Sequence, residues 1–266
     1  MEKRTEKGKS RFNLVDFHTH PYSHGDEKVG IDWINEFLQR AENRGLKELG
    51  FSDHDFLLDK INWDLLTRAK CESNISVRLG LEIGFRPEKK DYYKKIVDEY
   101  PLDFCIGSVH FIDDWNFDHP DYIEKFKERP IDQIYRDYFA LVFQALQTDL
   151  FDIVGHIDLI KIFNYFPQKK DVLDYMQSVL ALIKQKELVV EINTNGLNKP
   201  VAQYYPSKKI IKKLCENEID ITLGSDAHSP DRVGENLSQV AFFLKKIGFK
   251  RIAVFNKREK SFLPLG

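Results

Sequence analysis

This chain of 266 residues has few cysteines and a small net charge. Its three cysteines, Cys71, Cys105 and Cys215, are far apart and form no Cys-x-x-Cys pair, which argues against a cysteine-based zinc site or a dithiol redox motif. This usage favours a reducing cytoplasm, and we interpret Cys105, which lies in an apolar run, as a small core residue. The formal net charge of -2 argues against a protein that coats nucleic acid or anionic membranes.

Long apolar runs are also missing. No segment approaches the roughly 18 apolar residues that a membrane helix needs. The first eleven residues are rich in charge and lack the apolar region of a secretory signal. We therefore interpret residues 1–12 as a flexible tail and residues 13–266 as one domain, while the oligomeric state stays open.

Short apolar runs alternate with amphipathic stretches. The runs predict strands near 13–17, 47–51, 77–83, 103–107, 151–155, 188–193, 219–224 and 251–255. The stretches predict helices over 31–45, 62–72, 88–99, 131–147, 171–186, 206–217 and 235–247. This alternation requires a parallel sheet, and seven or eight strands in one chain predict a single closed α/β barrel. Segment 111–130 shows no clear period, so we expect a long loop of the kind that often acts as a lid.

Potential metal ligands follow almost every predicted strand. The nine candidates are His18, His20, His24, His54, Glu82, His110, His156, Asp226 and His228. In a barrel, the carboxyl ends of the strands meet at one mouth. His18 and His20 stand two residues apart on a strand, so their side chains point to the same face, and the carboxylate of Glu82 can bridge two metals. The joint pattern predicts one polynuclear metal centre.

Other polar residues in these segments have two interpretations each. Asp53, Asp55 and Asp158 either orient the ligands or cap helices. His119, in the segment without a period, is interpreted as a surface or lid residue and is not counted as a ligand.

Taken in order, the strand-end motifs resemble the polymerase and histidinol phosphatase (PHP) superfamily, and within it the monofunctional histidinol-phosphatases. The resemblance runs from about residue 14 to about residue 256. Its motifs are Asp16-x-His18-x-His20, Ser52-Asp53-His54, Gly80-x-Glu82, Gly107-Ser108-Val109-His110, Gly155-His156-Ile157-Asp158 and Gly224-Ser225-Asp226-Ala227-His228.

The resemblance implies a distorted (β/α)7 TIM-like barrel that holds three divalent metal ions. His18 and His20 would bind one ion together with Asp226 and Glu82. Glu82 would bridge to a second ion, held also by His110 and His156. A third ion would be held by His24, His54 and His228, with Asp26 as the alternative to His24. Imidazole and carboxylate suit zinc, iron and manganese alike. The predicted strand 251–255 would lie outside the barrel.

The implied activity is hydrolysis of L-histidinol phosphate to L-histidinol and phosphate in histidine biosynthesis, by a metal-bridging hydroxide that attacks phosphorus. Glu82, Asp226 and His228 would be the catalytic residues. Phosphate affinity also requires cations, and Lys161, Lys199 and Arg232 follow strands five, six and seven. Each is either a phosphate contact or a solvated surface charge.

Three other functions are weighed against this one. A PHP-type phosphoesterase could act on a different phosphomonoester or on a nucleotide. An amidohydrolase also begins with His-x-His but commonly uses a modified lysine as the bridge, where this chain has Glu82. A non-catalytic PHP domain usually accompanies a large polymerase domain. The expected partner is a small phosphate ester, with no nucleic acid and no membrane.

Overall fold

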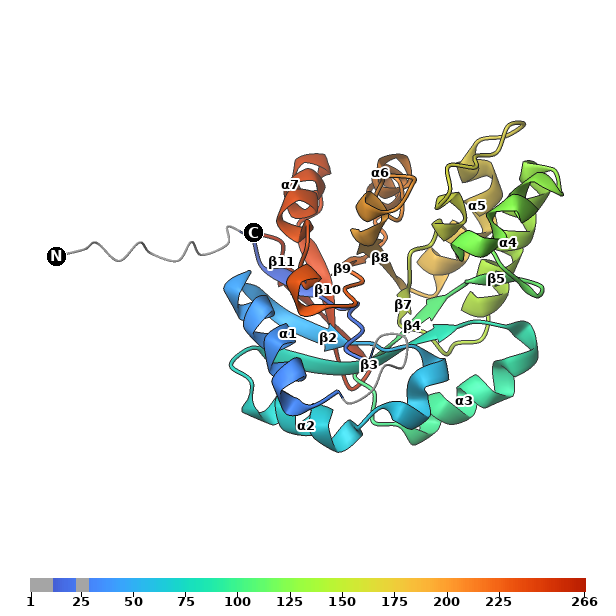
Figure 1. Cartoon of the computed structure of the whole chain (residues 1–266). Helices are drawn as coiled ribbons and strands as arrows, with labels where there is room; N and C mark the ends of the chain where they lie inside the picture. Colours follow the sequence, from blue (N-terminus) through green and yellow to red (C-terminus); the bar gives the residue numbers. More distant parts are fainter. Residues whose placement is uncertain (1–11, 23–28) are drawn as a thin grey trace.

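The computed structural model describes residues 12–22 and 29–266 (Figure 1). The predicted tail therefore lies outside the described residues, except for Phe12, which is buried with 9% of its surface exposed.

Seven parallel strands form one sheet in the order β1-β2-β3-β4-β7-β8-β9. They are β1 Leu14–Asp16, β2 Leu46–Phe51, β3 Ser76–Gly84, β4 Phe104–Ser108, β7 Ile153–Val154, β8 Val189–Asn193 and β9 Ile221–Gly224. The sheet closes between its first and last strands, where the amide of Phe17 donates to Leu223 O at 2.9 Å and that of His20 to Ala227 O at 2.8 Å. All seven strands were predicted, and the single barrel is confirmed.

Seven α-helices in the described part of the chain flank the strands (Figure 1). They are α1 Ile31–Asn43, α2 Trp63–Glu72, α3 Lys90–Glu99, α4 Ile131–Leu146, α5 Val172–Gln185, α6 Lys208–Glu216 and α7 Leu237–Ile247. Each buries an apolar stripe and exposes a polar face; in α1 the stripe includes Ile34, Phe37 and Ala41. Within the described ranges, no helix has the length and apolarity to span a membrane.

Phe104 fills the inside of the barrel. Its ring is fully buried and packs edge-on against Phe17, with ring centroids 4.9 Å apart. A Cβ atom added at Gly50 or Gly80 would lie 2.7 Å or 2.4 Å from the Phe104 ring. Two neighbouring strands thus lack a side chain where β4 supplies a large one, which keeps the interior closely packed.

Strand β10 Arg251–Asn256 stands outside the seven-stranded sheet, as expected for the surplus strand. It pairs in an antiparallel hairpin with β11 Glu259–Pro264, which the sequence pattern did not indicate. The sequence of β11 carries Glu259 and Lys260, and its burial is only partial, so it shows no strong apolar alternation.

The long loop expected over 111–130 contains short regular elements. The segment contains a hairpin of β5 Phe111–Ile112 and β6 Trp115–Asn116, followed by the 3-10 helix η4 Pro120–Lys127. Trp115 holds it together: its indole N–H donates to Tyr122 O at 3.3 Å, and its ring packs on Phe126 at 4.7 Å. The strands are two residues long, too short to show a period in the sequence.

Candidate metal centre

Glu82 is the middle of the site. Its carboxylate is fully buried at the end of β3, among five imidazoles that come from four other strand ends. The distances from a Glu82 carboxylate oxygen to the nearest ring nitrogen are 2.7 Å for His54, 2.9 Å for His156, 3.3 Å for His110, 3.5 Å for His18 and 3.7 Å for His20. The barrel therefore gathers residues that are far apart in sequence, as the strand-end pattern predicted.

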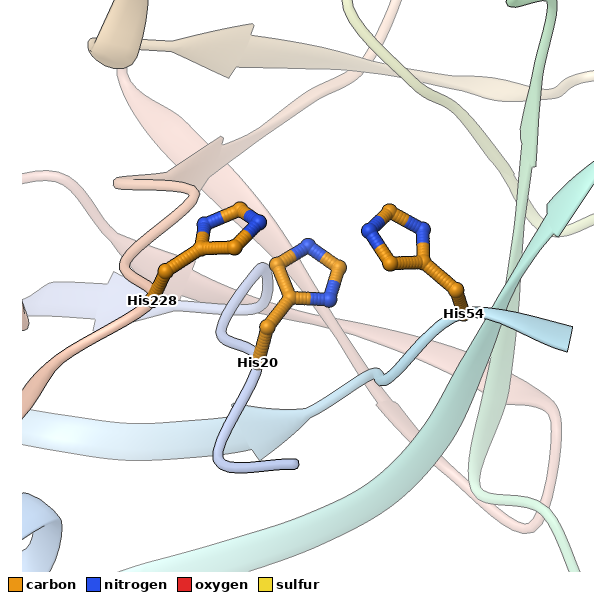
Figure 2. A group of neighbouring side chains, drawn as sticks. All are labelled: His20, His54 and His228. Carbon is orange, nitrogen blue, oxygen red and sulfur yellow. The ribbon is translucent and has the colours of Figure 1, made fainter. Parts of the chain in front are cut away.

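Four groups of three side chains have ligand atoms within 4.8 Å of one another. They are His20–His54–His228, His18–His156–Asp226, His18–His20–Glu82 and His54–Glu82–His110. Figure 2 shows the first group, in which three imidazoles from the segments after β1, β2 and β9 lie side by side. Eight of the nine predicted ligands belong to these groups; His24, with its alternative Asp26, lies outside the described residues.

The buried polar atoms of the site fit divalent cations. His18 Nε2, His20 Nε2 and Glu82 Oε2 are buried, and none makes a hydrogen bond of good geometry among the described residues, although His54 Nδ1 lies 2.7 Å from Glu82 Oε2. A buried polar group without a partner costs roughly 1–3 kcal/mol, and here several converge on one place. Neutral imidazole nitrogens and a carboxylate oxygen are ligands for zinc, iron or manganese. Metal binding therefore explains the arrangement.

The pKa values of Glu82 and His20 suit the same role. Burial alone would raise the pKa of Glu82, but His18 and His54, with hydrogen bonds from other imidazoles, hold that pKa well below its usual range. Burial lowers the pKa of His20 far below the usual value, and the neighbouring His54 and His228 lower it further. The carboxylate is thus ionised and the His20 ring neutral, the forms in which each binds a cation.

Carboxylates outside the ligand groups orient the histidines. Glu191 Oε1 lies 2.6 Å from His18 Nδ1, and Asp118 Oδ2 lies 2.8 Å from His110 Nδ1. Such contacts fix the tautomer and turn the other ring nitrogen towards a metal. Neither acid was predicted from the sequence as a site residue. A buried glutamate inside the apolar strand β8 was a usable signal for Glu191, whereas no sequence signal indicated Asp118.

The three aspartates for which the sequence left two interpretations accept hydrogen bonds from backbone amides. Asp53 Oδ1 accepts from Tyr22 N and Asp55 Oδ1 from Gly84 N, both at 2.9 Å. Asp158 Oδ2 accepts from Ser207 N at 2.9 Å. None of the three belongs to a ligand group, so they position the loops around the site.

A cavity of about 720 Å³ opens onto the ligands. Lys199 and Arg232 line it, together with Arg86 and Lys89, which were not predicted from the sequence. His119 lies at its lining as well, with 49% of its side chain exposed. Lys161 is not in the lining: its ammonium is buried and bound by Asp158 Oδ2 and Tyr204 O, both at 2.7 Å.

The barrel and its strand-end histidines define a PHP domain. The PHP domain family matches residues 16–195, and the chain belongs to this family. This confirms the resemblance.

Individual relatives carry a more specific name. A "Probable histidinol-phosphatase" from Deinococcus radiodurans is 32% identical over 241 residues, which cover 84% of this chain and 90% of that protein. The "Histidinol-phosphatase" of Lactococcus lactis is 25% identical over 260 residues, covering 91% and 94%. A crystal structure of the histidinol phosphate phosphatase from Lactococcus lactis, complexed with zinc, L-histidinol and phosphate, aligns with a TM-score of 0.75. It is 21% identical to this chain and covers 94% of it and 99% of the other.

Proposed function

We propose that this protein is a metal-dependent phosphomonoesterase that hydrolyses L-histidinol phosphate to L-histidinol and inorganic phosphate, a step of histidine biosynthesis. The observation that carries the proposal is the position of Glu82, an ionised carboxylate among five imidazoles in the lining of a cavity that Lys199 and Arg232 also line. The names of the relatives and the L-histidinol and phosphate held by the Lactococcus lactis protein support the substrate.

Three divalent ions are part of the proposal. His18, His20 and Asp226 would hold the first with Glu82, and His110 and His156 the second with the same carboxylate. His54 and His228 would hold the third, with His24 or Asp26 completing it. Zinc, iron and manganese all suit these ligands, and the zinc of the Lactococcus lactis structure favours that metal. When bound, such ions lower the pKa of a coordinated water to about 7 and neutralise the phosphoryl oxygens.

The protein's own residues would orient the ester. Glu82, Asp226 and His228 line the cavity and are the proposed catalytic residues. Arg232 is held in the cavity wall by Glu235, with Nε and Nη2 at 3.1 Å and 2.9 Å from the same carboxylate oxygen, and is the proposed phosphate contact. Lys199 is exposed and lines the same cavity, which suits a second contact. The ammonium group of Lys161 already forms an ion pair with Asp158, so Lys161 is the weakest of the three candidates for a phosphate contact.

A panel of phosphate esters, assayed together with elemental analysis of the purified protein, tests this proposal. We expect bound zinc, iron or manganese, and a kcat/KM for L-histidinol phosphate about 100-fold above that for other monoesters and nucleotides, a difference of about 2.7 kcal/mol. Equal turnover of the whole panel would favour the alternative, a PHP phosphoesterase for another ester. No turnover of any ester by the metal-loaded protein would overturn both.

The cytoplasm is the proposed compartment, and a small phosphate ester the proposed partner, with no nucleic acid and no membrane. All three cysteines are free thiols in the structure, which suits a reducing environment.

A further inference from the structure

The loop after β8 is bound to the loop after β9 by side-chain hydrogen bonds. Thr194 Oγ1 donates to Glu235 O at 2.7 Å, and Asn198 Nδ2 donates to Glu235 Oε2 at 2.9 Å. Two loops that line the cavity from neighbouring strands therefore share one network. Arg232 belongs to the same network through Glu235.

Asn195 occupies the inner part of this network. Its side chain lies between the cation of Arg232 and the carboxylate of Asp226. Asn195 Oδ1 accepts from Arg232 Nη2 at 3.0 Å, and Asn195 Nδ2 donates to Asp226 Oδ2 at 3.1 Å. Only 4% of the residue is exposed, and its own amide donates to Asn193 Oδ1 at 2.9 Å, which fixes the start of the turn.

The chemistry of this position requires an amide. The atom that faces Arg232 must be an acceptor, and the atom that faces Asp226 must be a donor. Asparagine supplies both from one planar group. An aspartate would keep the bond to Arg232 but would place a second carboxylate oxygen against Asp226, and an aliphatic residue would lose both bonds.

Both partners of Asn195 belong to the proposed machinery. Asp226 Oδ1 lies 3.4 Å from His20 Nε2, on the side of the ligands, while its Oδ2 is the atom that Asn195 holds. Arg232 lines the cavity in which the ester would bind. One buried amide thus fixes a ligand carboxylate and a cavity cation at the same time.

We propose that Asn195 is a positioning residue that couples the phosphate-binding cation Arg232 to the metal-binding carboxylate Asp226. This inference rests on the proposed function for the roles of those two residues. It adds that the two roles depend on one another through the side chain of Asn195, which bonds to both residues. Loss of the Asn195 amide is expected to weaken phosphate binding and metal binding together.

Asn195→Ala tests this, with Asn198→Ala as the matched control, because Asn198 joins the same two loops from the exposed side. In Asn195→Ala we expect inorganic phosphate to bind the metal-loaded protein about 10-fold more weakly, the loss typical of a hydrogen bond to a charged group. We expect zinc to bind about 10-fold more weakly in competition with a chelator. Both quantities are expected to stay within about twofold of wild type in Asn198→Ala. Equal behaviour of the two variants would overturn the proposal.

Two further variants separate positioning from general loosening of the loops. Asn195→Asp is expected to retain phosphate binding better than Asn195→Ala, because the contact to Arg232 remains. In an Arg232→Ala background, Asn195→Ala is expected to weaken phosphate binding by less than about twofold, since residues that act through one another are not additive. Full additivity of the two substitutions would reject an action through Arg232.

Inorganic phosphate and zinc are the probes, so the result does not depend on the substrate. Wild-type protein that binds phosphate but does not turn over L-histidinol phosphate would contradict the proposed substrate. The phosphate affinities of the Asn195→Ala and Arg232→Ala variants and of the double variant would still test the inference about Asn195. If the wild type does hydrolyse L-histidinol phosphate but the effects of Asn195→Ala and Arg232→Ala on phosphate binding are additive, only the inference about Asn195 is rejected.

Discussion

Glu191 Oε1 lies 2.6 Å from His18 Nδ1, and this contact decides which nitrogen of His18 faces the site. The opposite nitrogen, Nε2, lies 3.5 Å from Glu82 Oε2. The second oxygen of Glu191 accepts from the amide of His156 at 2.7 Å. A single acid on β8 thus orients ligands from β1 and β7, although it belongs to no ligand group itself.

Glu191→Gln is therefore expected to weaken metal binding without unfolding the barrel. Loss of the charge behind His18 lowers the basicity of its ring, and such substitutions typically cost about 10–100-fold in metal affinity. Chelator competition with zinc measures the loss. Glu48→Gln is the control, because Glu48 is also a buried strand carboxylate but pairs with Arg78 near the start of β2. Unchanged zinc affinity in Glu191→Gln would contradict the assigned role.

Glu82→Ala and His110→Ala are each expected to abolish turnover in a folded protein. Glu82→Ala removes the carboxylate that two of the proposed ions share, and His110→Ala removes a ligand of the second ion. We expect kcat to fall by about 1,000-fold or more, which corresponds to about 4 kcal/mol. Steady-state kinetics on L-histidinol phosphate measures the effect, with circular dichroism as the check on folding. Near-normal activity in either variant would reject the bridging site.

Removal of metal by a chelator is expected to lower the melting temperature. Ions that bind only the folded state stabilise it, by about 2.7 kcal/mol at a free concentration 100 times the dissociation constant. Thermal melts before chelation, after chelation and after zinc is restored measure the shift. Glu82→Ala should show a smaller shift than wild type, and an equal shift in both would place the stabilising metal elsewhere.

Gly80→Ala is expected to destabilise the barrel by about 1–3 kcal/mol, the usual cost of overpacking a core. The added Cβ would lie 2.4 Å from the Phe104 ring, which is fully buried. Urea denaturation measures the difference. Gly30→Ala is the control, because a Cβ there meets no atom within 4 Å. Equal stability of the two variants would show that the ring can shift.

Lys161→Met is expected to destabilise the fold and to leave phosphate binding unchanged. Its ammonium and the Asp158 carboxylate form a buried pair, and removal of one partner leaves an uncompensated charge at a cost of about 3–5 kcal/mol. Denaturation and the inhibition constant of inorganic phosphate are the two measurements. A rise in that constant of about 10-fold, with the stability intact, would instead support Lys161 as a phosphate contact.

Much of the fold was readable from local pattern. Each barrel strand is a short apolar run and each helix an amphipathic stretch, so hydrophobic periodicity alone located all of them. The hairpin within 111–130 escaped because its two-residue strands lie in no longer apolar run, whereas the equally short β7 lies within the predicted strand 151–155. The hairpin is stabilised by the packing of Trp115 on Phe126.

The sequence by itself predicted the candidate ligands, and eight of the nine belong to the groups that could hold a metal ion. The histidines and acids stand at the ends of parallel strands, and a closed barrel brings strand ends to one mouth whatever the details of packing. Only the tertiary structure decided which side chains support them. Glu191, Asp118 and Asn195 act through contacts of 2.6–3.1 Å with residues between 8 and 173 positions away, and no local pattern records such pairs. For the same reason, only the fold could show that the charge of Lys161 is already bound by Asp158.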